Sequence, residues 1–389
     1  MTKNSQIRNL LITPLLLYNM QITKEAYNQA IEVLEKCRTS HGFYAAFPGY
    51  QGVWARDSVI TSLGASLLKD KFEETFKQSL ITLAKHQSEK GQIPNAVLLN
   101  QNPVKIDYKS IDSTLWFIIG HYIYKERYNN NSLFNLQKTN IEKALTWLSY
   151  QDMGEDGMLE QLPTTDWQDA FPHRYGHTIN TQVLYYKVLN LTYQKEKAKK
   201  LKEIVNNNKS DALWKGNFYL PWRWKNHNKY QEKGEWFDSL GNLLAIIFEL
   251  ADKNETEKIL QYIKKNNINK PYPIKAIYPP ITKNSKDWQD YFEDCEAKTP
   301  YHYLNAGIWT FIGGFYILSL IKNKEFKEAE AQLRKLAEAN MQKPYFSEWL
   351  NGKTGLPRAS ASGKEGNQAW NAGMYILAYH SLEKKRCFI

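Results

Sequence analysis

Carboxylic acids stand beside tryptophans at separate places in this chain. Glu348 lies between Ser347 and Trp349 in a stretch that contains glycine and proline, which is typical of a loop. Asp166 and Asp169 stand three residues apart around Trp167. Aromatic rings stack on the apolar faces of sugars, and a carboxylic acid held against aromatic surface has a raised pKa, which suits a general acid. These stretches are therefore candidates for a sugar-binding site with proton chemistry, although acidic loop residues and Thr- and Asp-rich turns without any function look the same.

Three more charged residues stand where helices are predicted to begin. Arg56 and Asp57 follow Trp54, and Asp112 comes shortly before Trp116. An aspartate at the start of a helix is an ordinary cap, and this alternative stays open for both positions. In a sugar site, Asp57 would accept hydrogen bonds from hydroxyls and Arg56 would orient it.

Other kinds of site are not indicated. The histidines are scattered and form no metal-binding spacing such as HExxH, and there is neither a glycine-rich phosphate loop nor a GxSxG motif. We therefore predict no metal and no cofactor. Two carboxylates in an aromatic cleft are what glycoside hydrolysis needs. A lyase or epimerase would need a Tyr or His base, and Tyr175, His173 and His177 keep that alternative open.

The composition limits the classes of partner. The net charge of +11 resides largely in lysines along amphipathic stretches such as 194–202 and 264–270, where a solvated helix face is expected rather than a nucleic-acid surface. Residues 303–321 are apolar but contain polar side chains, and we interpret them as a buried helix rather than a membrane span. Three cysteines far apart in sequence indicate reduced thiols and a cytoplasmic protein. The oligomeric state is not predicted.

Helical periodicity dominates the chain and predicts about twelve helices: 25–38, 56–69, 71–87, 111–127, 138–150, 176–194, 196–206, 235–251, 254–265, 303–322, 324–340 and 366–385. The even-numbered ones are apolar nearly all round, which indicates burial on every side, and the odd-numbered ones are amphipathic. We therefore expect an inner and an outer layer, with residues 1–24 as an N-terminal arm and 25–389 as one catalytic domain.

The connections differ in length in a regular way. Each inner helix is preceded by a long segment and, in most cases, followed by a short turn. Short connections indicate antiparallel neighbours, and long ordered loops are usually functional. Six such hairpins closed in a ring predict an all-α (α/α)6 barrel with its long loops at one end. The tryptophans agree, because only Trp147 falls on a predicted outer helix. An open helical-repeat scaffold is the alternative, but no hairpin repeats another's sequence.

A set of motifs resembles the (α/α)6-barrel glycosidases that include neutral/alkaline invertases, amylo-α-1,6-glucosidases and processing-glucosidase-like hydrolases. They occur in family order: Val53-Trp54-Ala55-Arg56-Asp57, Asp112-Ser113-Thr114-Leu115-Trp116, Gln182-Val183-Leu184-Tyr185-Tyr186, Tyr303 to Trp309, Phe346-Ser347-Glu348-Trp349, and Gln368-Ala369-Trp370-Asn371-Ala372-Gly373.

The resemblance implies an inverting hydrolase with a small carbohydrate as its ligand. Its general acid would be Asp169, with Asp166 as the runner-up, and its general base Glu348, across a gap of about 6.5–9.5 Å. The expected sugar-binding residues are Trp54, Arg56, Asp57, Asp112, Asp166, Trp167, Gln182, Asn305, Trp309, Gln368 and Trp370.

Two departures leave the substrate open. Invertases of this type carry basic residues directly after the acid, whereas this chain has Ala170-Phe171-Pro172. Their His-Asn-Gly-Gly motif corresponds here to Leu304-Asn305-Ala306-Gly307. Sucrose, a small α-glucoside and an α-1,6-linked oligosaccharide therefore all remain candidates.

Overall fold

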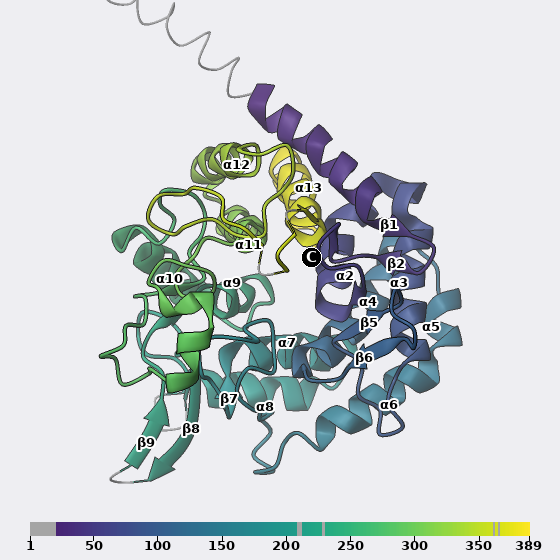
Figure 1. Ribbon diagram of the computed structural model, residues 1–389. Coiled ribbons are helices and arrows are strands. Elements are labelled where there is room, and N and C mark those ends of the chain that lie inside the picture. Colours follow the sequence, from purple (N-terminus) through teal and green to yellow (C-terminus); the bar gives the residue numbers. More distant parts are fainter. Residues whose placement is uncertain (1–20, 208–211, 228–229, 361, 365) are drawn as a thin grey trace, which may run out of the picture.

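Six inner helices form a closed ring in the computed structural model, which describes residues 21–207, 212–227, 230–360, 362–364 and 366–389 (Figure 1). Each packs against the next, and the last returns to the first. They are α2 (Ala55–Ala65), α4 (Ile111–Tyr128), α7 (Ile179–Leu191), α9 (Ser239–Ile247), α11 (Thr310–Lys322) and α13 (Ala369–Glu383). The ring confirms the predicted (α/α)6 barrel and excludes an open solenoid.

An outer layer covers this ring. Its helices bury one face and expose a Lys- and Glu-rich face, as an amphipathic pattern requires. They are the helix over residues 21–37, α3 (Glu73–Lys85), α6 (Lys138–Ser149), α8 (Lys195–Asn206), α10 (Lys253–Lys265) and α12 (Phe326–Asn340). All twelve predicted helices therefore exist. The short helices α5 (Ser132–Leu136), η1 (Ser66–Phe72), η2 (Asp290–Asp294) and η3 (Glu296–Lys298) come in addition.

Glycines permit the closest contact in the ring, between α2 and α13. A Cβ atom on Gly64 would lie 1.8 Å from the carbonyl oxygen of Gly373, and one on Gly373 would lie 2.3 Å from that of Thr61. Neither backbone could approach so closely with a larger residue. These small residues in apolar helices thus close the ring where its first and last members meet.

The predicted helix over 303–322 begins too early, because α11 starts only at Thr310. Residues 303–309 form a tight turn and an extended stretch, with positive φ at Tyr303 (45°) and Ala306 (64°). Asn305 explains part of this difference. Its side chain forms hydrogen bonds with the backbone of Ile281 and Ala297, and these bonds hold the segment in a conformation that is not helical.

The long loops contain short strands. The all-α prediction did not include these strands. The longest pair is the hairpin of β8 (Trp222–His227) and β9 (Tyr230–Lys233), joined by β7 (His177–Thr178). The other strands pair as β1 (Arg38–Thr39) with β2 (Gly42–Phe43), β3 (Ala46–Phe47) with β12 (Asn367–Gln368), β4 (Val53–Trp54) with β5 (Ala96–Leu98) and β6 (Lys105–Asp107), and β10 (Phe237–Asp238) with β11 (Ile277–Tyr278). Several lie directly before inner helices, so they tie the long loops to one another at one end of the barrel.

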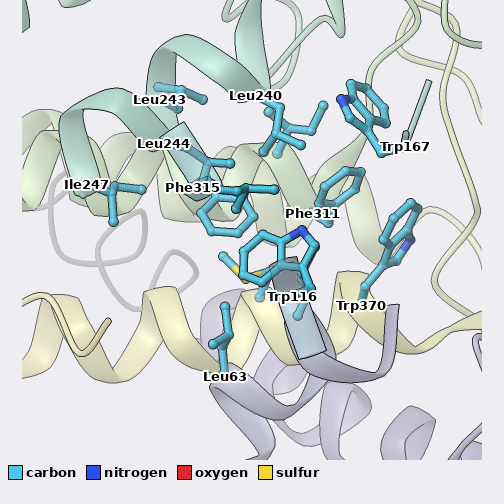
Figure 2. Packing of buried hydrophobic residues seen from close by; sticks show 14 of the residues in the cluster. Leu63, Trp116, Trp167, Leu240, Leu243, Leu244, Ile247, Phe311, Phe315 and Trp370 are labelled. Atoms are coloured by element: carbon cyan, nitrogen blue, oxygen red, sulfur yellow. The ribbon is translucent and has the colours of Figure 1, made fainter. Parts of the chain in front are cut away.

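Apolar side chains fill the barrel axis. Trp116 is fully buried among Leu63, Phe311 and Phe315, and Trp370 stacks on Phe311 with 4.0 Å between ring centroids (Figure 2). The barrel is therefore a packed core rather than a channel, and a cavity near the axis is open only toward the long loops.

The predicted N-terminal arm lies outside the described residues except for 21–24, which belong to the first outer helix. That helix includes residues 21–24, which lie before the predicted start at 25. No helix among the described residues is both long enough and apolar enough to cross a membrane.

Candidate active site

A pocket opens at the loop end of the barrel. Four of the six long loops and the first turns of α2 and α13 supply its walls. Nine of the predicted site residues line it: Trp54, Arg56, Asp57, Trp167, Asp169, Trp309, Glu348, Gln368 and Trp370. Larger hollows exist elsewhere, for example between α12 of the outer layer and the end of α13, but they lie away from these carboxylates.

The two candidate catalytic carboxylates enter this pocket from opposite sides of the ring. Asp169 belongs to the loop before α7, the third inner helix, and Glu348 to the loop before α13, the sixth. In a closed ring of six, these helices face each other. A sugar between them would meet one carboxyl group on each side, which is the arrangement that inverting hydrolysis requires.

Glu348 is held by hydroxyl groups. Its side chain is 5% exposed, Tyr50 donates to Oε1 over 3.2 Å, and the Ser360 hydroxyl donates to Oε2. Donors on both oxygens stabilise an ionised carboxylate and fix its orientation. Burial, followed by the charge of Glu348, raises the pKa of the Tyr50 phenol, so Tyr50 remains a protonated donor at neutral pH.

Asp169 has a different environment. Its side chain is exposed to solvent at the pocket, although many protein atoms surround it there. Desolvation raises its pKa from 3.8 to about 6, although the nearby Arg56 guanidinium acts in the opposite direction. Asp169 is therefore about half protonated at pH 6 and about one tenth protonated at pH 7, far more than an aspartate of ordinary pKa. One carboxyl group that can donate a proton and one that accepts hydrogen bonds are the pair that acid–base chemistry needs.

Several buried polar atoms around the pocket have no hydrogen-bond partner within the described residues. They are the indole nitrogens of Trp54, Trp167 and Trp370, Oδ2 of Asp57 and Nε of Arg56. Buried polar groups are nearly always paired in native proteins, and five such atoms around one pocket indicate a polar ligand or water there. Burial also raises the pKa of Asp57 to about 6.

Asp112 and Asp166 lie behind the pocket wall, contrary to the expectation that they contact the ligand. Both oxygens of Asp112 accept from Nη1 of Arg56 over 3.0 Å. Asp166 accepts from Arg174 over 2.6 Å and from the backbone of Gln168. Both carboxylates are fully buried and taken up by these partners, so only Asp169 of the two candidate acids is open to the pocket.

Gln182 and Asn305 are likewise absent from the pocket lining. The Gln182 amide bonds both the N–H and the carbonyl of Leu159, and the Asn305 amide braces the loop of Ile281. Both side chains are fully buried. They hold loops in place instead of binding a ligand directly.

Three lining residues were not predicted: Ala45, Tyr50 and Tyr303. Tyr50 stands between Gly49 and Gln51 in a loop that contains glycine. An aromatic residue in such a loop is the same signal that drew attention to Trp349, so Tyr50 could have been predicted from it. Tyr303 was placed on a helix that does not extend so far. No cluster of three potential metal ligands occurs among the residues that the structure describes.

Comparisons with known proteins point to carbohydrate hydrolases. The family of alkaline and neutral invertases matches residues 232–385. Among curated proteins, neutral/alkaline invertase 3, chloroplastic, of Oryza sativa subsp. japonica is 28% identical over 153 residues, which is 38% of this chain and 24% of that protein. Neutral/alkaline invertase 1, mitochondrial, of the same organism is 31% identical over 121 residues, 31% of this chain and 19% of that protein. These matches span about a quarter or less of the relatives' length.

Solved structures share the fold over nearly the whole chain. A GH63 mannosylglycerate hydrolase from Thermus thermophilus, in complex with Tris and D-glycerate, has a TM-score of 0.65 at 12% identity, covering 90% of this chain and 99% of that one. A wild-type glycosidase has a TM-score of 0.68 at 13% identity, covering 94% and 98%. At such identities the likeness shows the fold alone. This shared fold and the matches to invertases together confirm the resemblance to (α/α)6-barrel glycosidases that was inferred from the motifs.

Proposed function

We propose that this chain hydrolyses an α-glucosidic bond in a small sugar or oligosaccharide with inversion of the anomeric configuration. The observation that carries the proposal is the pair of carboxyl groups, Asp169 and Glu348, that line one aromatic pocket from opposite sides of the ring. The similarity to invertases and to glycosidase structures supports it.

In this mechanism Asp169 protonates the glycosidic oxygen as the bond breaks. Glu348 removes a proton from a water molecule that attacks the anomeric carbon from the other side. Tyr50 and Ser360 hold the base in place. The unpaired indole nitrogens and the Arg56–Asp57 pair, 3.8 Å apart, then bind hydroxyls of the sugar whose anomeric carbon reacts.

The pocket is closed at its inner end, which favours a short substrate. Trp309 and Trp370 line the pocket and pack together in the aromatic cluster that fills the axis. A sugar therefore enters from the loop side and cannot pass through the barrel, which fits removal of a terminal residue better than attack within a polymer.

Lyase or epimerase chemistry has less support. Tyr175 donates to Glu232 over 2.5 Å, and His173 bonds Tyr291 over 3.0 Å. His177 lies near Glu160. None of the three lines the pocket. Tyr50 and Tyr303 do line it, but burial raises the pKa of both phenols, which disfavours either of them as a base. A cytoplasmic location remains a prediction, because the relatives' names place those proteins in chloroplasts and mitochondria.

The proposal is tested by a proton-NMR time course with the purified protein. The panel contains sucrose, trehalose, isomaltose, maltose, glucosylglycerate and mannosylglycerate. A β-anomer that appears first from one α-glucoside identifies the substrate and establishes inversion. Release of the α-anomer first would refute the mechanism, and cleavage of mannosylglycerate alone would refute the α-glucoside assignment.

The pH dependence follows from the raised pKa of Asp169. The acid must be protonated before the bond breaks, so kcat/KM for phenyl α-D-glucoside is expected to fall above pH 6, by about tenfold per pH unit. α-D-Glucosyl fluoride is the control, because fluoride leaves without a proton and its hydrolysis should lack this limb. A limb of the same midpoint with both substrates would assign it to another group, such as Asp57.

Tyr50→Phe removes one of the two hydroxyl donors on Glu348. Loss of one such hydrogen bond corresponds to about 1.4 kcal/mol, so we expect kcat to fall about tenfold, with little change in the melting temperature. Tyr44→Phe is the matched control, because Tyr44 belongs to the same loop but does not line the pocket. Equal effects of the two substitutions would contradict a role of Tyr50 in holding the base.

A further inference from the structure

The loop that carries Asp169 is closed at its base. Gln161 and Gly176 exchange both backbone hydrogen bonds, over 3.0 and 2.9 Å, so residues 162–175 leave and return at one point. Farther along this loop, the carbonyl oxygen of Thr165 accepts from the backbone N–H of Ile111, the first residue of α4, over 2.8 Å. The loop is thus anchored at its base and at α4.

A buried arginine fastens the loop from inside. Arg174 is fully buried, as are Asp166 and Asp238. Its Nη2 donates to Asp166 over 2.6 Å, which joins the two sides of the loop, and its Nη1 donates to Asp238, which accepts from the N–H of Gly241 and so caps α9. One planar guanidinium therefore links the loop to a second inner helix.

The side chain of Gln161 extends this clamp to a third helix. Its Nε2 donates to Asp166 over 3.2 Å, and its Oε1 accepts from the hydroxyls of Thr178 and Thr181 over 2.6 Å each. These threonines stand at the start of α7. A continuous buried chain of polar contacts thus runs from α7 through Gln161, Asp166 and Arg174 to Asp238 and α9.

The segment between Asp166 and Arg174 contains Trp167 and Asp169, both of which line the pocket. Among the described residues, Asp166 and Arg174 make most of the side-chain hydrogen bonds and ion pairs of residues 166–174. We propose that Arg174 is a positioning residue, which holds the carboxyl group of Asp169 at the glycosidic oxygen by clamping the loop through Asp166 and Asp238. This inference rests on the proposed function of Asp169.

Buried charges suit this task because the protein loses stability when such charges are separated from their partners. Separating a buried guanidinium from two carboxylates costs far more free energy than breaking a hydrophobic contact, since an unpaired buried charge is strongly disfavoured. The loop is therefore restricted to the one arrangement in which Arg174 reaches both aspartates. Displacement of a catalytic group by about 1 Å can cost about 10²-fold in rate.

The experiment compares two substrates in three variants. Arg174→Lys keeps the charge but lacks the two-sided fork, Arg174→Met removes both links, and Asp238→Asn removes only the charge at α9. We expect kcat/KM for phenyl α-D-glucoside to fall at least ~50-fold in the arginine variants. For α-D-glucosyl fluoride the loss should be only about fivefold, because Trp167 on the same loop is displaced for both substrates but fluoride needs no acid. The loss in Asp238→Asn should be smaller but show the same preference.

Glu255→Gln is the control for stability alone. Glu255 is buried and forms the capping box of α10, with Tyr219 as a further donor, and it does not line the pocket. Its replacement should lower the melting temperature while leaving the ratio of the two activities unchanged. A parallel loss of both activities in the Arg174 variants would overturn the positioning role.

A second readout does not depend on turnover. Carbon-13 NMR of the aspartate carboxyl groups, assigned with Asp169→Asn, follows the titration of Asp169. In Arg174→Lys and Asp238→Asn the loosened loop moves Asp169 away from the protein atoms that surround it, so its pKa should move from about 6 toward 3.8. An unchanged titration would refute the clamp, whereas wild-type protein inactive on both substrates would refute the proposed function alone.

Discussion

Replacement of Glu348 by Gln is expected to abolish turnover, with kcat/KM lower by about 10³-fold or more for phenyl α-D-glucoside and α-D-glucosyl fluoride alike. Loss of a general base costs about 10²–10⁴-fold, and water must be activated whichever group leaves. Gln keeps the size of the side chain, and its oxygen can still accept from Tyr50 or Ser360. The fold should therefore survive.

The measurement is a progress curve for each substrate with the melting temperature of the same preparation. Glu338→Gln on α12 is the control, because Glu338 lies outside the pocket and pairs with Arg334 at 3.7 Å. Full activity of Glu348→Gln would reject Glu348 as the base.

Asp169→Asn is expected to separate the two substrates. Without a proton donor, cleavage of phenyl α-D-glucoside should fall about 10²–10⁴-fold, and the limb above pH 6 should disappear with the group that causes it. Hydrolysis of α-D-glucosyl fluoride should persist, because it still has its base and needs no acid. Steady-state kinetics over a pH series measure both effects.

Asp166→Asn tests the alternative acid. Asp166 is fully buried and paired with Arg174, so its replacement should lower the melting temperature and weaken the clamp on the loop, but the pH limb should remain. Loss of the limb in Asp166→Asn and its survival in Asp169→Asn would reverse the assignment.

Periodicity was a reliable guide to the helices for a physical reason. An inner helix touches neighbours on every side and must be apolar all round, as α11 is, whereas an outer helix such as α12 needs only one apolar face. Both requirements are local, so twelve helices and their alternation could be predicted. The long loops could be located for the same reason, as the stretches where neither pattern continues.

The site was predictable only in part. Trp54, Trp167, Glu348 and Trp370 could be selected because aromatic and carboxylate residues in loops or at the starts of inner helices are a local signal. Tyr303 was missed, because it belongs to a segment whose apolar pattern continues that of α11 but whose path is set by Asn305 and its distant partners Ile281 and Ala297.

The sequence by itself determined the alternation of buried and amphipathic helices, the ring that they form, and the set of residues from which a sugar site can be built. Only the tertiary structure decided which of these residues face the pocket. Asp166 and Asp169 are equivalent as residue types, but Arg174 and the backbone of Gln168 take up the first while the second stays open. Some partners are distant in sequence, such as Asp238 for Arg174 and Tyr50 for Glu348. They come into contact only when the ring closes, so no local sequence pattern predicts these contacts.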